Sequence, residues 1–452
     1  MILLEQDAPM AAQSRQGLMP GRETSNVRTK LRQERLRHRL ESPCQIMRLH
    51  RGKTAVDWVG VGVGISACRG MPLVSLAVPW SQFLPGVELT RKEKWALDVV
   101  VYLIIHARLY NRRKGGRGYY PVSYGYIRAI AGTPGVRALK WLVGMGAVEC
   151  DGRYIKGEKS YGYKLTTTAT SWGYSVRPMP AQIAARFDKH WTERRREAEK
   201  AGETYKQQWR VLQSVTLDPA IWPALLKPPR GENRIKAVHR ILSACHMRNR
   251  NWYFSHDEKT GRCFTNVTNF PADYRKYLRI GGRSTSEGDI ANSQPTGLVA
   301  VAYARQEDSP ERAYALGLVQ AGAFYSTVCD WAGLGHLPHK KQKQRVFAGV
   351  LFAKDHSESV LWPGVIKRLP VMAACIEGVK RAGPNALALR LQKQEAEIML
   401  GRVFPRLAAM GIAALSLHDG CLVTSEHLAT ARRVIEEEYE AATDIRPTVR
   451  TK

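Results

Sequence analysis

The chain has 452 residues, of which 44% are hydrophobic, enough for two or three globular domains with ordinary cores. It carries 69 Lys and Arg against 40 Asp and Glu, a formal net charge of +29. An excess of this size is typical of proteins that neutralise phosphates, so nucleic acid is the expected partner. The sequence has no run of 18 apolar residues and no signal-peptide pattern, so we expect a cytoplasmic protein without membrane association.

Eight cysteines are scattered along the chain without a C-x-x-C pair. This spacing indicates neither a disulfide framework nor a zinc site. Buried thiols are the expected state of these residues.

The first predicted region, residues 1–90, is basic. The stretch VRTKLRQERLRHRL, which starts at Val27, contains six Arg or Lys residues and one Glu. Its composition is typical of a disordered arm or a short helix on nucleic acid, and equally of a solvated charged helix.

Residues 91–170 have the rhythm of a small DNA-binding domain. A long apolar helical pattern is followed by a Gly/Arg-rich loop, two shorter helical patterns and two strand-like runs. Helices followed by a basic hairpin resemble a winged helix-turn-helix, whose last helix enters the major groove. The expected DNA contacts are Arg137, Lys140, Lys156 and Lys159. A protein-interaction module is the alternative interpretation.

Residues 171–235 have mixed charge and then become rich in proline. The stretch from Trp191 indicates an exposed helix, and the stretch from Ile221 indicates a linker. We therefore predict a helical, charged linker here, followed by a last region over residues 236–452.

Near the C-terminal end, the segment GIAALSLHDGCLVTSE joins two apolar runs through His418, Asp419 and Gly420. Two such runs joined by Asp-Gly predict a strand, a tight turn and a second strand. Asp-Gly is favoured in turns for backbone reasons alone. A histidine beside a carboxylate at the tip of a buried hairpin favours a chemical role as well.

The stretch from Asp257 contains a series of motifs in a fixed order. They are Thr260, Gly261 and Arg262, then Asn269 and Pro271, then Asp289 after Gly288, and then Ser293 and Gln294. This order resembles the nucleic-acid polymerases of family A and, more distantly, the single-subunit phage RNA polymerases. The Ser-Gln pair lies two residues later than in the family pattern.

Three further landmarks of the family follow in the family's order. A helix with the pattern Arg-x-x-x-Lys-x-x-x-Phe corresponds to His339, Lys343 and Phe347, with Phe352 beyond it. Lys343 and Phe347 are four residues apart and share a helix face. Where the family has Arg, this chain has His339, and Lys340 or Lys341 is the alternative phosphate contact. Next come Gln392 and Glu395 on a predicted helix, and finally His418 and Asp419.

The resemblance implies an α+β fold over residues 236–452, a right-hand polymerase palm and fingers with an antiparallel sheet, preceded by the winged helix-turn-helix. It implies a monomeric DNA-directed DNA polymerase that acts on primer-template DNA and nucleoside triphosphates, serving replication or priming of a phage, plasmid or mobile element. Nucleotide addition needs two divalent ions at the attacking and leaving oxygens. Asp289 and Asp419 would hold two Mg²⁺ ions, with Mn²⁺ as the alternative.

The resemblance also implies roles for other side chains. Lys343 would neutralise the triphosphate and protonate the leaving pyrophosphate, and Phe347 would stack on the incoming base. The expected nucleotide-binding set is Lys343, Phe347, His339, Lys340, Gln294 and Phe352. The expected primer and template contacts are Arg262, Thr260, Asn269, Gln392, Glu395 and His418. An ordinary surface arginine and a hairpin-filling histidine are the alternatives for Arg262 and His418.

The fifth residue after the first Asp discriminates sugars in this family, and here it is Gln294. If the Ser-Gln pair is aligned with that of the family instead, the position is Thr296. Phage RNA polymerases have a small residue there, and neither Gln294 nor Thr296 is glycine, which favours deoxynucleotides. The alternatives are an RNA polymerase or primase of the same fold and a non-catalytic replication initiator that binds DNA. The joint presence of Asp289, Asp419 and Lys343 favours an enzyme.

Overall fold

The computed structural model describes residues 71–77, 80, 84, 86–110, 118–154, 160–171, 174–226, 234–304 and 309–452. The basic stretch from Val27 and two predicted DNA contacts, Lys156 and Lys159, lie outside these ranges. Within the described ranges, no helix combines the length and hydrophobicity needed to cross a bilayer.

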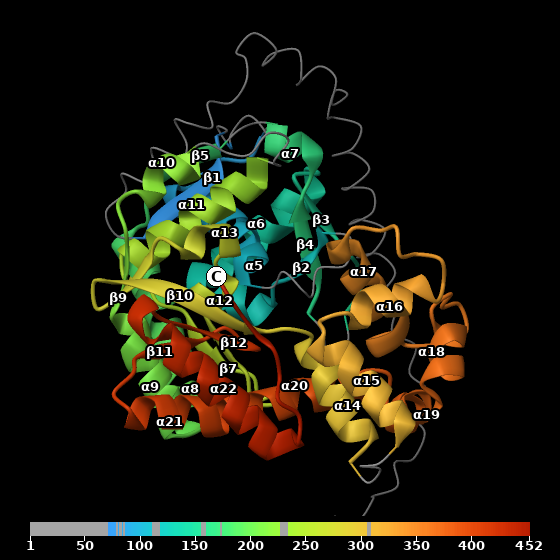
Figure 1. The fold of residues 1–452 in the computed structure, drawn as a ribbon. Helices are drawn as coiled ribbons and strands as arrows, with labels where there is room; N and C mark the ends of the chain where they lie inside the picture. The colour runs from blue at the N-terminus through green and yellow to red at the C-terminus, as the bar shows by residue number, and fades with distance from the viewer. Residues whose placement is uncertain are drawn as a thin grey trace, which may run out of the picture. The chain divides into compact units, whose positions relative to one another are not determined.

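The first part of the fold surrounds one long buried helix, α5 (Figure 1). The elements in chain order are β1 (Pro72–Leu76), α5 (Arg91–Tyr110), β2 (Tyr120–Pro121), α6 (Tyr124–Gly144), β3 (Val148–Cys150), β4 (Gly162–Leu165), α7 (Thr167–Ser171) and β5 (Tyr174–Pro178). Strands β2, β4 and β3 form a three-stranded antiparallel sheet in that order. The middle of α5, from Leu97 to Ile105, is buried, and every residue in it except Asp98 is apolar, as expected of a helix that is surrounded by other elements.

Helix α6 consists of two helical segments. Gly132 lies between them with a left-handed φ of 68°, and Pro134 follows two residues later. A proline interrupts the backbone hydrogen bonds of a helix, and glycine adopts a positive φ at little cost. The break lies where the sequence predicts a boundary between two short helices.

The segment 171–235, interpreted from sequence as a charged linker, contributes regular elements to the main body. They are α8 (Ala181–Lys200), α9 (Glu203–Gln213), β6 (Val215–Leu217) and α10 (Ile221–Leu226), and α11 (Arg234–Arg248) follows. Strand β6 pairs with β9 (Leu278–Ile280) at the edge of the central sheet. The buried faces of these helices, which include Phe187 and Leu212, belong to the same core as α5.

The central sheet has six strands, and every pairing in it is antiparallel. Its order is β11 (Ala414–Ser416), β12 (Gly420–Thr424), β10 (Arg283–Ile290), β9 and β6, and β13 (Val449–Thr451) also pairs with β10. Two short strands, β7 (Phe254–His256) and β8 (Cys263–Thr265), form a separate hairpin that leads into α12 (Asn266–Asn269) and α13 (Ala272–Arg275). The predicted mixture of helices with an antiparallel sheet is confirmed, whereas the palm, fingers and winged helix stay interpretations.

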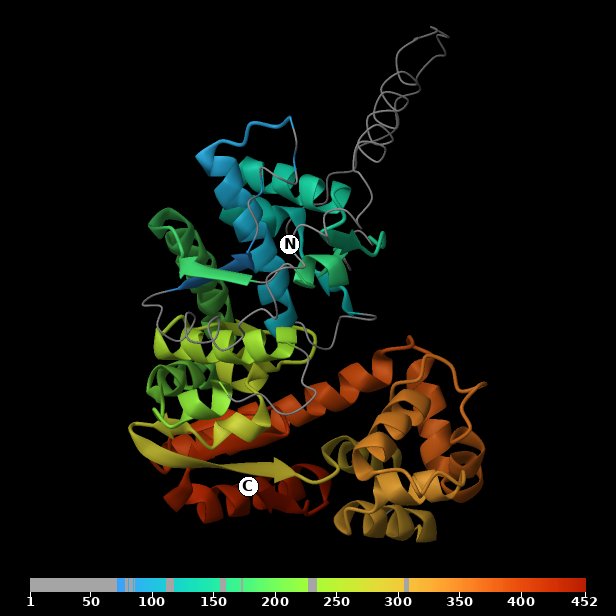
Figure 2. The same cartoon turned by 90° about the horizontal axis from the view of Figure 1, so that it is seen from above.

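A second hydrophobic core lies in the helices that follow β10, which we call the helical lobe. These helices are α14 (Ser293–Ala302), α15 (Pro310–Gln320), α16 (Phe324–Asp330), α17 (His339–Val346) with its π-helical extension η2 (Phe347–Leu351), α18 (Trp362–Arg368), α19 (Pro370–Lys380) and α20 (Ala386–Ile398). Figure 2 shows β10 running toward this lobe. Helix α20 joins the cores, because Leu391 packs in the lobe and Ile398 packs in the main body.

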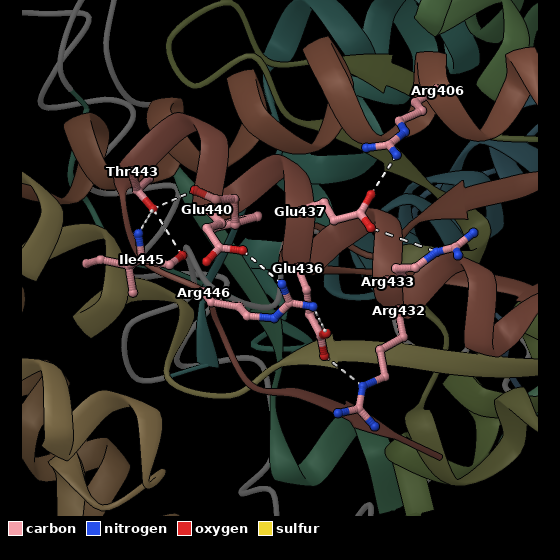
Figure 3. A network of polar contacts seen from close by, with 10 residues as sticks. Arg406, Arg432, Arg433, Glu436, Glu437, Glu440, Thr443, Ile445 and Arg446 are labelled. Atoms are coloured by element: carbon pink, nitrogen blue, oxygen red, sulfur yellow. Dashed lines mark hydrogen bonds and ion pairs between the residues drawn. The ribbon is translucent and has the colours of Figure 1, made fainter.

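The chain returns to the main body through η3 (Met399–Val403) and α21 (Phe404–Ala409). The β11–β12 hairpin follows, and then a 3₁₀ turn, η4 (Ser425–His427). The last elements are α22 (Leu428–Thr443) and β13. Ion pairs fasten α22 to its neighbours (Figure 3). Arg406 of α21 pairs with Glu437 at 2.6 Å, and Arg446, beyond the helix, pairs with Glu436 at 3.1 Å. Both arginines are close to half exposed, at 42% and 49%, so each pair contributes little, and the buried face of α22 against the sheet supplies most of its stability.

Candidate functional site

Asp289 and Asp419 lie at the same end of two neighbouring strands. Asp289 of β10 is paired in register with Gly420, the first residue of β12. The backbone N–H of Ile290 donates to the carbonyl oxygen of Asp419 at 3.0 Å. The antiparallel ladder therefore brings together two carboxylates that are far apart in the sequence.

The turn that carries Asp419 is shaped by the residues on both sides of it. His418 has a φ of 74°, a left-handed conformation that costs a non-glycine residue about 1 kcal/mol or more. Gly420 has no such angle, and its lack of a side chain serves a different purpose. A Cβ on Gly420 would overlap the carbonyl oxygen of Gly288 and lie 3.0 Å from the Cα of Asp289. Glycine thus lets β12 approach β10 beside both carboxylates.

Replacement of Gly420 by Ala should disturb this hairpin. The added methyl group meets backbone that cannot move aside, so we expect a loss of about 1–3 kcal/mol in the free energy of unfolding. Urea unfolding of the purified protein measures this loss. Gly411→Ala is unsuitable as a control because of its positive φ, whereas Gly378→Ala places a methyl in open space on α19 and should leave stability unchanged or raise it by up to about 1 kcal/mol. Equal stability of the Gly420→Ala and Gly378→Ala proteins would contradict the packing argument.

A third carboxylate, Glu395 of α20, is buried next to this strand end. Its side chain forms an ion pair with Arg262, and it accepts hydrogen bonds from Ser293 Oγ at 2.6 Å and Gln294 Nε2 at 2.9 Å. Both partners of the ion pair are almost inaccessible, with 6% of the Arg262 side chain and 3% of the Glu395 side chain exposed. This arrangement links the β7–β8 hairpin, the start of α14 and the middle of α20.

The three carboxylates act on one another electrostatically. Burial, together with the negative charges of Glu395 and Asp289, raises the pKa of Asp419 to about 7, while the charge of Lys343 opposes the shift. Burial, followed by the charges of the same three carboxylates, raises the pKa of Tyr325. A site that holds a proton on a carboxylate near neutral pH also favours a bound cation, because either one relieves the repulsion.

A cation of the chain itself already lies beside this group. Lys452, one residue beyond β13, has its Nζ 3.4 Å from Oδ2 of Asp289. The Lys452 side chain is 57% exposed and the Asp289 side chain 36% exposed, so both reach solvent. Asp289 is therefore accessible to a ligand from outside.

One face of α17 is directed toward Tyr325 of α16. Lys343 Nζ lies 5.6 Å from the centroids of both the Tyr325 and Phe347 rings. His339 and Phe347 have ring centroids 6.1 Å and 5.8 Å from that of Tyr325. Phe352 packs on Phe347 at 4.9 Å. His339, Lys343 and Phe347 thus share a face, and Lys343 is close enough to the carboxylates to influence Asp419.

Several residues of the expected primer and template set have structural partners. Thr260 Oγ1 donates to Asp257 at 2.7 Å, and Asn269 Nδ2 donates to the carbonyl oxygen of Thr265 at 3.2 Å. Gln392 lies partly exposed on α20, almost one turn before Glu395, and the His418 ring meets Phe264 edge-on at 4.9 Å. Their contacts with nucleic acid, like that of Arg262, stay predictions. Lys340 is exposed at the start of α17.

Two residues of the site have no counterpart in the sequence prediction. Tyr325 of α16 lies opposite the face of α17 that carries His339 and Lys343, and Lys452 lies beside Asp289. An aromatic residue in the apolar run FYSTVCD and a lysine at the end of a basic chain carry no local signal of function. Only the tertiary structure brings them to the carboxylates.

The expected DNA contacts of α6 lie on the surface. Arg137 is 61% exposed and pairs with Glu93 of α5 at 2.9 Å, and Lys140 is exposed one turn further along the helix. Helix α5 also packs on α11, where the Tyr102 hydroxyl group is 3.0 Å from Nε2 of His246. This module therefore shares a core with the body that carries the carboxylates.

Asp289 and Asp419 supply the oxygen ligands that a magnesium ion prefers. Within the described residues, no three His, Cys, Asp or Glu side chains are arranged to hold a metal ion by themselves. Magnesium commonly takes one or two protein carboxylates and completes its coordination with water and substrate phosphate. Asp289 and Asp419 meet this requirement, since both supply oxygen ligands and their mutual repulsion favours a cation.

Comparison with known proteins gives a weak structural similarity. No protein-family model matches the sequence, and no curated protein matches it. Among solved structures, the chain is similar to the POL domain of Pol1 from M. smegmatis, solved in complex with DNA primer-template and dNTP. The similarity has a TM-score of 0.34 and 15% identity, and it covers 59% of this chain and 65% of that chain. A likeness at this level does not assign an activity; the side chains around Asp289 and Asp419 are the basis for a function.

Proposed function

We propose that this chain catalyses template-directed nucleotidyl transfer and extends a DNA primer with deoxynucleotides. The observation that carries the proposal is that Asp289, near the end of β10, lies beside Asp419, in the turn before β12, with buried Glu395 next to them and Lys343 near enough to act on Asp419 electrostatically. Two adjacent carboxylates can hold the divalent ions that the transfer of a nucleotidyl group from a triphosphate requires. The net charge of +29 supports a polyanionic partner.

Asp289 and Asp419 would hold two Mg²⁺ ions, which would supply Lewis-acid stabilisation of the attacking and leaving oxygens. The residues around them have separate tasks. Arg262, Ser293 and Gln294 hold Glu395 in place, so that its charge stays fixed beside Asp419. These bonds tie α20 to the β7–β8 hairpin and to the start of α14.

Lys343 would bind the triphosphate and Phe347 would support the base. The Tyr325 ring lies near both side chains, 5.6 Å from Lys343 Nζ and 5.8 Å from the Phe347 ring, measured from its centroid. In this position Lys343 is able to give a proton to the leaving pyrophosphate.

Lys343→Ala should raise the KM for the incoming nucleotide and lower kcat, because both the bound triphosphate and the leaving group lose a positive charge. We expect a fall in kcat/KM of about a hundredfold, or roughly 3 kcal/mol of transition-state stabilisation. Steady-state primer extension over a range of nucleotide concentrations measures it. Arg345→Ala is the matched control, since Arg345 is an exposed cation on the same helix outside the Tyr325 contact. Equal effects of the two substitutions on kcat/KM would mean that the total positive charge of α17 is important and that the position of Lys343 is not.

Gln294 is proposed to discriminate between sugars. Its side chain is buried beside Glu395, and its Oε1 has no hydrogen-bond partner among the described residues. Gln294→Ala should narrow the preference for dNTP over rNTP by about tenfold, because a shorter side chain leaves room for one hydroxyl group. Competition between a dNTP and the matching rNTP in primer extension measures the ratio. A ratio that does not change would place the discriminating residue elsewhere, and a wild-type preference for rNTPs would favour the RNA polymerase or primase alternative.

The module of α5, α6 and the β2–β4–β3 sheet is proposed to bind duplex DNA as a winged helix-turn-helix. The exposed positions of Arg137 and Lys140 on the second half of α6 support this role. Since α5 is part of the common core, removal of the module would unfold the body. Substitution of the exposed residues Arg137 and Lys140, with DNA affinity as the measured quantity, is therefore the appropriate test of this role.

The experiment that tests the proposed function uses the purified full chain. It is incubated with primed or unprimed single-stranded DNA, Mg²⁺, and labelled dNTPs or rNTPs. The proposal predicts extension of the primed template with dNTPs. DNA binding without incorporation under any of these conditions would favour the non-catalytic initiator.

A further inference from the structure

We propose a second ligand site that is separate from the carboxylates. It is a cavity that binds a single nucleotide unit. The cavity has a volume of about 520 Å³ and lies between α8, α9 and the turn that joins α11 to β7. A volume of this size is typical of sites for small molecules. The residues on which the argument depends are Trp191, Trp209, Trp252, Arg195, Arg250 and Asn251.

The walls of the cavity are flat and aromatic. Trp191 and Trp252 are buried, with 6% and 8% of their surface exposed, and Trp209 is partly exposed. The Arg195 guanidinium group lies over the Trp209 ring, 4.9 Å from its centroid. Nucleobases stack on aromatic rings and on guanidinium planes, and neither surface demands a particular base.

Two residues that line the cavity carry buried hydrogen-bond donors that lack acceptors. Nδ2 of Asn251 and Nε of Arg195 are buried and make no hydrogen bond with any described residue. The nearest charged group to Arg195 Nε is Glu199, at 3.8 Å. Buried donors without acceptors are uncommon in folded proteins, and a ligand with acceptor atoms, such as a base edge, would satisfy them.

The charge at the cavity favours an anion. Its charged residues are Arg195, Arg250 and Asp188, which give a net charge of +1 (two positive, one negative). Arg250 is exposed and has a φ of 56°, a strained conformation for a residue other than glycine. An exposed arginine at the rim suits the phosphate of a nucleotide whose base lies in the cavity.

Helix α9 connects this cavity to the carboxylate hairpin. Trp209 forms part of the cavity, and the preceding residue, Gln208, is directed to β11. Gln208 Nε2 donates to the carbonyl oxygen of Ala414 at 3.0 Å, and the N–H of Ser416 donates to Gln208 Oε1 at 2.7 Å. One rigid helix thus supports both sites, so a single strand bound in the cavity would be held on the body that carries Asp419.

Two sources offer the same chemistry, a free nucleotide and one unit of a single strand. Photo-crosslinking separates them, with free 5-iodo-deoxyuridine monophosphate in one arm and a short oligothymidylate carrying one 5-iodouracil in the other. Crosslinked peptides are mapped by mass spectrometry without divalent ions. We expect crosslinks to Trp209 or Trp252 from the oligonucleotide; crosslinks from the free nucleotide alone would assign the site to mononucleotides.

Variants and controls make this experiment decisive. At sub-saturating oligonucleotide, Trp209→Ala should reduce the crosslink to Trp252 by about fivefold or more, and Trp209→Phe should retain it. Arg250→Gly should reduce it as well, whereas Arg210→Gln, an exposed arginine of α9 that pairs with Glu203, should not. Asp419→Asn tests the proposed function separately, since it should stop extension and leave this crosslink intact. Crosslinks confined to other peptides in both arms would overturn the proposal.

Discussion

Asp419→Asn should abolish primer extension while the protein remains folded. An amide has no negative charge and binds a divalent ion weakly, so the reaction loses stabilisation of several kcal/mol, a decrease in kcat of about a thousandfold or more. Single-turnover extension of a labelled primer measures the loss, with DNA affinity measured in parallel. Asp273→Asn is the matched control, because Asp273 is an exposed carboxylate at the start of α13. Activity within tenfold of the wild type for Asp419→Asn would remove this residue from the site.

The same substitution should increase stability above neutral pH. The pKa of Asp419 is about 7 in the folded protein, against an ordinary value of 3.8. The folded state therefore binds more protons than the unfolded chain between about pH 4 and 7, and the free energy of unfolding falls as the pH rises through this window. Asp419→Asn should be more stable than the wild type by about 1–3 kcal/mol at pH 8, and the difference should disappear near pH 4. A difference that is constant with pH would contradict the shifted pKa.

Glu395→Gln should destabilise the protein more than any surface change. Arg262 would remain buried without its counter-charge, and removal of one partner of a buried ion pair costs about 3–5 kcal/mol. Urea unfolding at neutral pH measures the free energy of unfolding. The matched control is Glu397→Gln on the same helix, whose pair with Lys393 is 3.8 Å long and 64% exposed on both sides. This control should change stability by less than about 0.5 kcal/mol.

A double variant separates charge from packing at this position. Arg262→Met with Glu395→Leu removes both charges, so much of the stability lost in Glu395→Gln should return. Primer extension should stay low in the double variant, because Ser293 and Gln294 lose their acceptor and the α14 end is no longer held. Recovery of extension together with stability would show that Glu395 only supports the fold.

The local features of this fold could be predicted from sequence. The apolar runs around His418 and Asp419 form the hairpin β11–β12, and the spacing of His339, Lys343 and Phe347 places them on one face of α17 and η2. Both depend on periodicity over a few residues.

The features that escaped prediction depend on long-range contacts. In the turn before β12, the residue with a positive φ is His418 and not Gly420. Gly420 is needed because β12 passes close to Gly288 of β10, a contact that depends on strand pairing across the sheet. The sequence does not predict strand β6, because three residues are too few to show the alternation of apolar and polar side chains that is typical of a strand. The ion pair of Arg262 with Glu395 joins two motifs that look like separate surface positions in the sequence.

Templated incorporation by the purified chain is the most direct measurement. A primed single-stranded template is offered each of the four dNTPs singly, with Mg²⁺, and the labelled primer is examined for addition of one nucleotide by the wild-type and Asp289→Asn proteins. The carboxylate pair predicts that the wild type adds only the nucleotide complementary to the template base and that Asp289→Asn adds none while still binding the DNA. Undiminished incorporation by Asp289→Asn, or no incorporation by a wild type that binds the primed template, would contradict a polymerase site at β10 and β12.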